Sequence, residues 1–328
     1  MGLQYRLTEA RLAEILRRQD PPRFGPGYEP SIKPTREEAP SSSRPAAVWV
    51  DKLGRDVCVL SRAERSALAV IVYCCPTLFE LHEQRMLPFL PGLHPLHGHP
   101  LAAGLHLPPT RGTLQITHDL GYLKFHPVVH VLGQDGAPPD QAPGCWIGDF
   151  LAFLTDEGGP YCVNINVKST RSEFEAPQVG VTMRSDPIRA QIKEKARHET
   201  ERVLYSDHQI RTVEVAADEL PHILIANLFQ LIGWQKRRST LSPDAVALVI
   251  DAFNEGLERE ASPLDVICAT ELSHGLPWYE QKIVFHQAVF FRKLRLDLIE
   301  SHLFIDRPMR SETQDAVEMF EPWFRRWT

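Results

Sequence analysis

Apolar positions in the first sixty residues change period three times. Residues 7–18 place leucine and isoleucine at helical spacing and are followed by two prolines, which predicts one short helix. Residues 21–45 are rich in Pro, Gly and Ser without packing periodicity, so we expect an arm that either orders on binding or wraps the surface. Two strands are then predicted, 46–50 and 56–60, joined by a turn at 52–54.

A capped helix is predicted after these strands. Ser61 stands three residues before Glu64, the spacing of a reciprocal capping box, and the apolar run that follows extends to about Tyr73. Glu64 is therefore expected in a first helical turn. The segment 91–110 contains four histidines among prolines, and we interpret it as an ordinary loop because a zinc site needs fixed ligand geometry.

The middle of the chain carries a hairpin signature. Strand-like runs that begin at Asp149 and Tyr161 flank a turn at 156–159, and the second run ends at Lys168. Residues 187–204 are polar and helix-forming, whereas 203–205 resemble a further strand.

From residue 207 the pattern changes to successive apolar helical segments without hairpins, which predicts a separate helical module. The expected helical segments are 217–235, 241–258, 263–272 and 282–300. The predicted organisation has three parts: an N-terminal helix and arm (1–45), an α/β domain (46–206) and a helical domain (207–328).

Composition narrows the class of protein. A hydrophobic fraction of 43% and a charged fraction of 24%, without a long apolar run, are typical of a globular protein and not of a membrane protein. The amino end lacks the features of a secretory signal, so we expect a cytoplasmic protein. Six cysteines without C-x-x-C spacing are expected to be reduced thiols. A formal net charge of -6 argues against unaided DNA binding through a bulk basic surface, so a nuclease function would require a partner to deliver the chain.

The hairpin contains residues suited to metal-assisted phosphodiester cleavage, which needs hard oxygen ligands at one point. Alternation places Asn166 and Lys168 on one strand face, and Asp149 begins the adjacent strand. Lys168 would orient or help deprotonate the attacking water, or offset transition-state charge. The pattern alone is weak, because its strict form has Glu or Gln where Asn166 stands. Either the Asn166 side chain or the backbone carbonyl beside it, that of Val167, would complete the metal shell.

Several weak motifs in order produce a resemblance to a known family. The chain resembles TnsA, the endonuclease subunit of heteromeric TnsA/TnsB-type DNA transposases. The resemblance covers residues 25–168: GPGYEP, PSSSR, the K-x-G-R turn at 52–55, LSRAE at 60–64, FELHEQ at 79–84, GDFL at 148–151 and NVKST at 166–170.

The resemblance implies residue roles that spacing leaves open. It matches Glu64 and Asp149 to the metal-binding acids and Lys168 to the catalytic lysine, with Asn166 at a position where the family usually has Gln. It selects Glu64 over Glu80 and Glu83, and these two and His82 are kept as support positions in the FELHEQ segment. A further acid from 187–204, Glu194 or Glu199, is not aligned.

The resemblance also implies fold, cofactor and partners. The expected fold is a restriction-endonuclease-like core, a mixed sheet flanked by helices, with a winged-helix-like C-terminal domain that contacts a TnsC-type AAA+ ATPase. The implied reaction is Mg²⁺-dependent hydrolysis, with Mn²⁺ as a substitute, of the non-transferred strand in double-stranded DNA at transposon ends, together with a TnsB-like transposase. Two alternatives stay open: a stand-alone restriction or repair nuclease of the same fold, and a non-catalytic adaptor, which only Asn166 favours.

Overall fold

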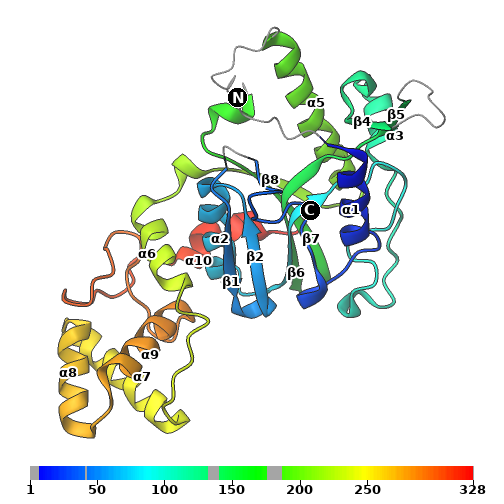
Figure 1. Ribbon diagram of the computed structural model, residues 1–328. Coiled ribbons are helices and arrows are strands. Elements are labelled where there is room, and N and C mark those ends of the chain that lie inside the picture. The colour runs from blue at the N-terminus through cyan, green and yellow to red at the C-terminus, as the bar shows by residue number, and fades with distance from the viewer. Residues whose placement is uncertain (1–6, 41–42, 132–139, 176–186, 328) are drawn as a thin grey trace.

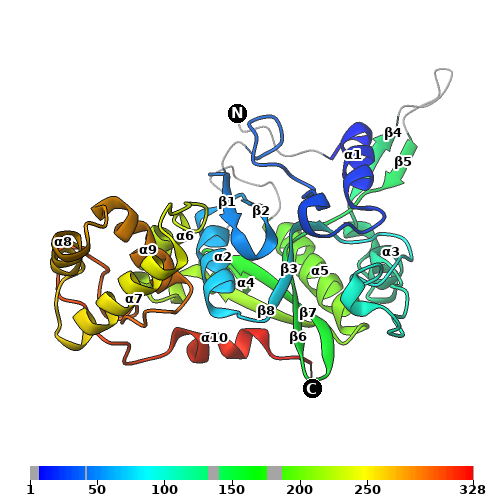
Figure 2. The same cartoon turned by 90° about the horizontal axis from the view of Figure 1, so that it is seen from below.

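A four-stranded mixed sheet forms the centre of the protein. The computed structural model describes residues 7–40, 43–131, 140–175 and 187–327. The strand order is β3-β6-β7-β8, in which β3, β6 and β7 are antiparallel and β8 runs parallel to β7. Figure 1 labels β6, β7 and β8, and Figure 2 labels β3 as well. These strands are Leu78–Met86, Ile147–Asp156, Gly159–Lys168 and Arg211–Ala216. The expectation of an α/β fold with a mixed sheet flanked by helices is confirmed at this level.

Two helices cover the faces of this sheet, α2 (Arg62–Cys74) and α5 (Pro187–Ser206). Alternate residues of β6 divide between two apolar cores, as a strand buried on both sides requires. Phe150 belongs to the core that includes α2, whereas Leu151 belongs to the core that includes the end of α5. The helix α2 begins as predicted, because the Ser61 hydroxyl accepts a hydrogen bond of 3.0 Å from the Glu64 backbone N–H.

Two separate hairpins flank the main sheet (Figure 2). The predicted strands near residues 46–60 are confirmed as β1 (Ala46–Val50) and β2 (Arg55–Val59), and Gly54 adopts the left-handed φ of 63° that their turn requires. A second hairpin pairs β4 (Val128–Val131) with β5 (Asp140–Pro143). The remaining short elements are η1 (Gly25–Gly27), η2 (Asp51–Leu53), η3 (Pro100–Ala102), α3 (Thr113–Asp119), η4 (Leu123–Phe125), α4 (Ser172–Glu175) and η6 (Ala217–Glu219).

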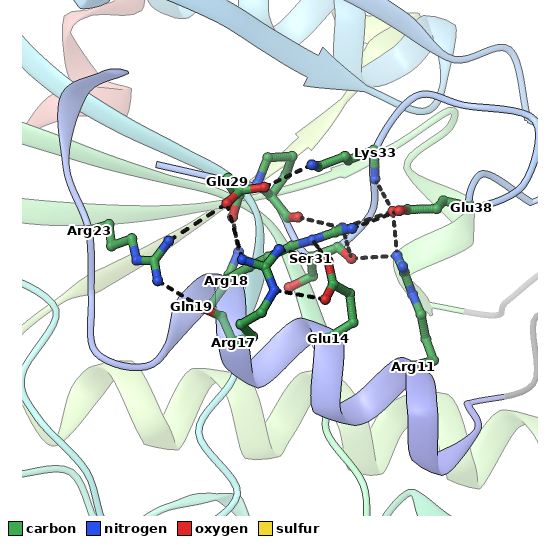
Figure 3. A network of polar contacts seen from close by, with 11 residues as sticks. Arg11, Glu14, Arg17, Arg18, Gln19, Arg23, Glu29, Ser31, Lys33 and Glu38 are labelled. Carbon is green, nitrogen blue, oxygen red and sulfur yellow. Dashed lines mark hydrogen bonds and ion pairs between the residues drawn. The ribbon is translucent and has the colours of Figure 1, made fainter. Parts of the chain in front are cut away.

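The N-terminal arm wraps the surface, which decides between the two alternatives left by its sequence. Helix α1 (Glu9–Gln19) and the arm behind it lie against the edge strand β3. The Ser31 N–H donates to the Gln84 carbonyl at 3.0 Å, and the Tyr28 hydroxyl donates to the Glu83 carbonyl at 2.6 Å. Polar contacts hold the arm to α1, with Glu38 accepting from two arginines of that helix (Figure 3). The arm therefore satisfies a strand edge that would otherwise present unpaired backbone groups.

Residues 203–216 form other elements than the sequence predicts. Residues 203–205 form no strand and instead lie in the last turns of α5. The next segment is β8, which pairs with β7, so the domain boundary expected after residue 206 is wrong because it divides the central sheet. Five helices follow, α6 (His222–Ile232), α7 (Pro243–Glu258), α8 (Pro263–His274), α9 (Trp278–Phe290) and α10 (Ala316–Phe324).

The helical part shares one apolar core with the sheet and α2. Leu228 of α6, Phe253 of α7 and Phe320 of α10 belong to the same buried cluster as Ile71 of α2. The Tyr161 hydroxyl of β7 donates to the Phe324 carbonyl at 2.7 Å, so α10 returns to the sheet. Within residues 217–327 the β pairing consists of one isolated bridge, between Leu296 and Ser311. No helix in the described residues is long and apolar enough to cross a membrane.

Candidate active site

The centre of the site lies where β6 and β7 diverge. Their ladder ends at the pair Phe150 and Ile165. Beyond it the Val167 N–H donates to the Asp149 carboxylate at 2.7 Å, in place of a backbone carbonyl of β6. In an extended strand the N–H and C=O of one residue point to the same side, so the Val167 carbonyl points to the same edge of β7. The Asp149 carboxylate and the Val167 carbonyl therefore both lie between the two strands.

Glu64 approaches Asp149 from the first turn of α2. Its carboxylate accepts hydrogen bonds from the Leu60 N–H at 2.8 Å, the Ser61 hydroxyl at 3.0 Å and the Gln84 side-chain amide at 2.9 Å. Burial, together with the negative charge of Asp149, raises the pKa of Glu64 to about 7. Both carboxyl groups line one cleft of about 940 Å³. The cap that starts α2 is thus also the device that fixes the orientation of Glu64.

Lys168 lies beside an ionic group on α5. Its ammonium nitrogen is 3.0 Å from a carboxylate oxygen of Glu194. The same carboxylate lies 3.3 Å from the His198 ring and 3.5 Å from the Arg197 guanidinium. The neighbouring His198 ring, followed by the charges of Arg197 and Lys168, holds the pKa of Glu194 well below its usual range. Lys168 itself does not line the cleft of Glu64 and Asp149, but Glu194 does, so this ion pair places Lys168 beside the cleft.

The Asn166 side chain does not join this cleft. It is buried on the α5 face of β7, where its carbonyl oxygen accepts from the Asn164 amide at 3.4 Å. It lines a different hollow of about 860 Å³, between α5 and β8. The expected strand alternation is present, but the parallel neighbour β8 places Glu214 in register with Asn166. The expectation that its side chain completes a metal shell with Glu64 and Asp149 is therefore not met in this arrangement.

The support positions of the FELHEQ segment lie outside the cleft. Both carboxylate oxygens of Glu83 contact the Arg55 guanidinium at 3.0 Å, and Glu80 is 3.6 Å from the same group. The ring of His82 is fully buried and stacks on Tyr28 at a centroid distance of 4.0 Å. These contacts are structural. Of Glu64, Glu80 and Glu83, only Glu64 shares a cleft with Asp149.

Glu194 and Glu199, the two acids of α5 that the sequence offered, differ in position. Glu194 lines both the cleft and the hollow that contains Asn166, whereas Glu199 lies 3.6 Å from Lys195 and lines the hollow alone. Glu194 is thus the acid of this helix that the structure brings to the site.

Three further residues in or near the cleft were not selected from the sequence. Gln84 lines the cleft and holds Glu64 in place. Arg197 lines it as well and donates to the Ile147 carbonyl at 2.8 Å. Glu201 is fully buried beside the Asn164 amide, at 3.2 Å. The available signal was the charged spacing of 194, 197, 198 and 201, because these positions share the helix face that covers a sheet and would ordinarily be apolar.

The cleft offers ligands that fit Mg²⁺. Within the described residues no group of three or more His, Cys, Asp and Glu side chains is arranged to hold a metal. Mg²⁺, however, commonly uses one or two carboxylates and keeps water and substrate phosphate as its other ligands. Glu64, Asp149 and the Val167 carbonyl supply this kind of donor set. The raised pKa of Glu64 beside Asp149 indicates that a cation would relieve their repulsion.

Basic side chains line the same cleft as the two acids. Lys124 comes from the η4 segment, and Arg189, Lys193 and Arg197 come from α5. This combination of an acidic centre and a basic wall suits a phosphate-containing polymer. No protein-family model matches the chain, and no curated protein matches it.

Proposed function

We propose that this chain is a Mg²⁺-dependent DNA endonuclease with a restriction-endonuclease-like core, acting as the TnsA-type subunit of a heteromeric transposase. The observation that carries the proposal is the convergence of Glu64 and Asp149, from α2 and β6, on one cleft. The basic wall of that cleft supports a nucleic-acid substrate. The motifs shared with TnsA, in the same order along the chain, support the specific assignment.

Residues in and beside the cleft have distinct roles in the proposed hydrolysis. Glu64, Asp149 and the Val167 carbonyl would hold the metal. A bound Mg²⁺ would supply Lewis-acid polarisation of the scissile phosphate. Lys168 would orient the attacking water or offset charge that develops on the phosphate, and Glu194 positions the Lys168 ammonium at 3.0 Å.

Partner dependence follows from charge. The net charge of -6 disfavours unaided DNA binding, so the proposed enzyme is delivered to transposon ends by a TnsB-like transposase and a TnsC-like ATPase. Helices α6–α9 provide the surface for such contacts. A winged-helix-like arrangement of these helices is part of the same proposal.

A strand-specific cleavage assay tests the proposal. The full chain, its recombinase partner and transposon-end DNA are incubated with Mg²⁺ or Mn²⁺, with each DNA strand labelled separately. Asp149→Ala and Lys168→Ala should abolish cleavage of the non-transferred strand. Asp156→Ala and Lys195→Ala are matched controls, because Asp156 ends the same strand and Lys195 belongs to α5 without lining the cleft. Unchanged cleavage by the first two variants would refute the catalytic assignment.

The same assay separates the alternatives. A stand-alone nuclease would cut without the recombinase. A non-catalytic adaptor would support assembly but leave both strands to its partners, and the position of Asn166 outside the cleft is the observation in its favour.

A further inference from the structure

We infer that a second basic surface, outside the cleft and formed by β1, the turn after α6 and the first turns of α9, binds the phosphate backbone of duplex DNA. Cations there lie over aromatic rings. The Arg237 guanidinium is 4.3 Å from the centroid of the Trp234 ring, and the Lys282 ammonium is 5.6 Å from it. The Lys236 ammonium is 4.8 Å from the ring of Trp49. These five residues are called the aromatic–basic surface.

The cations of this surface have no carboxylate partners among the residues that the structure describes. Lys236, Arg237 and Lys282 take part in none of the ion pairs there; the nearest pair, Arg238 with Asp51, is separated by 4.0 Å. The other basic cluster of the helical part differs. Arg292 and Arg295 each contact both Glu312 and Asp315, at 2.5–3.4 Å. One cluster is therefore neutralised internally, and the other keeps its charge for a ligand.

Ring contacts hold these cations without consuming their hydrogen-bond donors. A cation over an aromatic face is attracted by the ring quadrupole, while its N–H groups stay available to an anion. Lys236 and Arg237 are exposed, whereas the rings of Trp49 and Trp234 are partly buried. The fixed rings thus reduce the entropy that a flexible side chain loses when it binds phosphate.

The position of the surface favours DNA over an acidic protein. Arg65 follows Glu64 in α2, and its guanidinium lies 4.5 Å from the ring of Phe229 in α6. Trp234 stands two residues beyond the C-terminal end of α6. Arg65 and the aromatic–basic surface therefore border the same helix, one at Phe229 and the other just past the last turn. A duplex carries a phosphate charge about every 1.7 Å along its axis, so neighbouring phosphates can reach more than one of these cations. The inference rests on the proposed function in naming DNA as ligand.

Fluorescence anisotropy of the full chain with a labelled duplex tests the inference, starting at low salt, where phosphate contacts are strong enough to be measured without the partners. EDTA is present throughout, so binding is measured without cleavage and a failed endonuclease assignment does not affect the result. The variant is Lys236→Ala with Arg237→Ala. Its control, Arg307→Ala with Arg310→Ala, removes two exposed charges beside the α7–α8 junction, where the Met309 N–H donates to the Ala261 carbonyl at 3.0 Å.

Loss of two phosphate contacts should weaken binding roughly tenfold or more and reduce the slope of log K against log salt by about two. The control should bind as wild type does. Lys282→Gln, which leaves Lys236 and Arg237 in place, should give a smaller loss in the same direction and guards against misfolding of the double variant. The inference is wrong if the double variant and wild type share one affinity and salt slope, if the control weakens equally, or if wild type binds no duplex. A variant that loses affinity for polyglutamate but not for DNA would identify an acidic protein ligand instead.

Discussion

Glu64→Gln should stabilise the metal-free protein at alkaline pH, although it removes a proposed metal ligand. The folded-state pKa of Glu64 is about 7, compared with 4.5 for the free side chain. For a carboxyl group whose pKa is raised on folding, stability is fully present below about pH 4.5 and is lost as pH rises through 7. Glutamine does not ionise, so the variant escapes this loss.

The size of this stabilisation follows from the shift in the pKa of Glu64. A difference of about 2.5 units, at about 1.4 kcal/mol per unit, corresponds to about 3 kcal/mol at pH 8. Glutamine can keep the existing contacts, because its carbonyl oxygen can accept from the Leu60 N–H and from Gln84 while its amide donates to the Ser61 hydroxyl. The stabilisation should therefore approach the electrostatic value at pH 8 and fall to about 1 kcal/mol or less at pH 5.

Urea unfolding in EDTA at pH 5 and pH 8 measures this difference. Glu83→Gln is the matched control, since the same substitution there leaves the buried Arg55 guanidinium with a weakened partner and should cost about 3–5 kcal/mol. Mg²⁺ at pH 8 should stabilise the wild type more than Glu64→Gln, because a bound ligand stabilises the folded state. The reasoning is refuted if Glu64→Gln is no more stable than wild type at pH 8, or if its advantage is equal at both pH values.

Three further predictions concern the fold. Gly112→Ala should lower the free energy of unfolding by more than about 2 kcal/mol in a thermal melt, because the new Cβ would lie 2.5 Å from the Leu90 carbonyl carbon at a φ of 81°; an unchanged melt would contradict this backbone. Tyr28→Phe should cost about 1–2 kcal/mol in urea, since it removes the 2.6 Å hydrogen bond to the Glu83 carbonyl; a neutral effect would show that the arm is held otherwise. A maleimide should modify Cys268 first, because it is the exposed free cysteine, and mass spectrometry of early adducts on another cysteine would argue against the packing of α8.

Local signals predicted the parts of the site that local structure determines. The Ser61 cap placed Glu64 in a first helical turn, and the turn at 156–159 predicted the pairing of β6 with β7. Both depend on residues that are close in sequence, where turn chemistry and capping act directly. The choice of Glu64 over Glu80 and Glu83 needed the family resemblance, because all three are acidic and lie upstream of the hairpin.

Long-range contacts were not predictable in the same way. The strand β8 was assigned to the helical module because a parallel strand pairs through a distant crossover, and nothing adjacent in sequence marks its partner. The attachment of the arm to β3 depends on backbone groups of Glu83 and Gln84, which any residue type carries. The strand-like residues 203–205 are apolar because they end α5 against a core.

The geometry at β7 favours the backbone alternative for the third ligand. The ladder with β6 stops at Ile165, so Val167 has no carbonyl partner on β6 and its N–H binds the Asp149 carboxylate. A carbonyl on that edge of β7 keeps its position whatever side chain precedes it. An asparagine in place of the family's usual glutamine then changes the packing under α5, where Asn164 contacts Asn166, but leaves the carbonyl in place. The departure from the TnsA pattern at Asn166 is therefore compatible with the proposed metal site, in which the backbone and not the amide completes the shell.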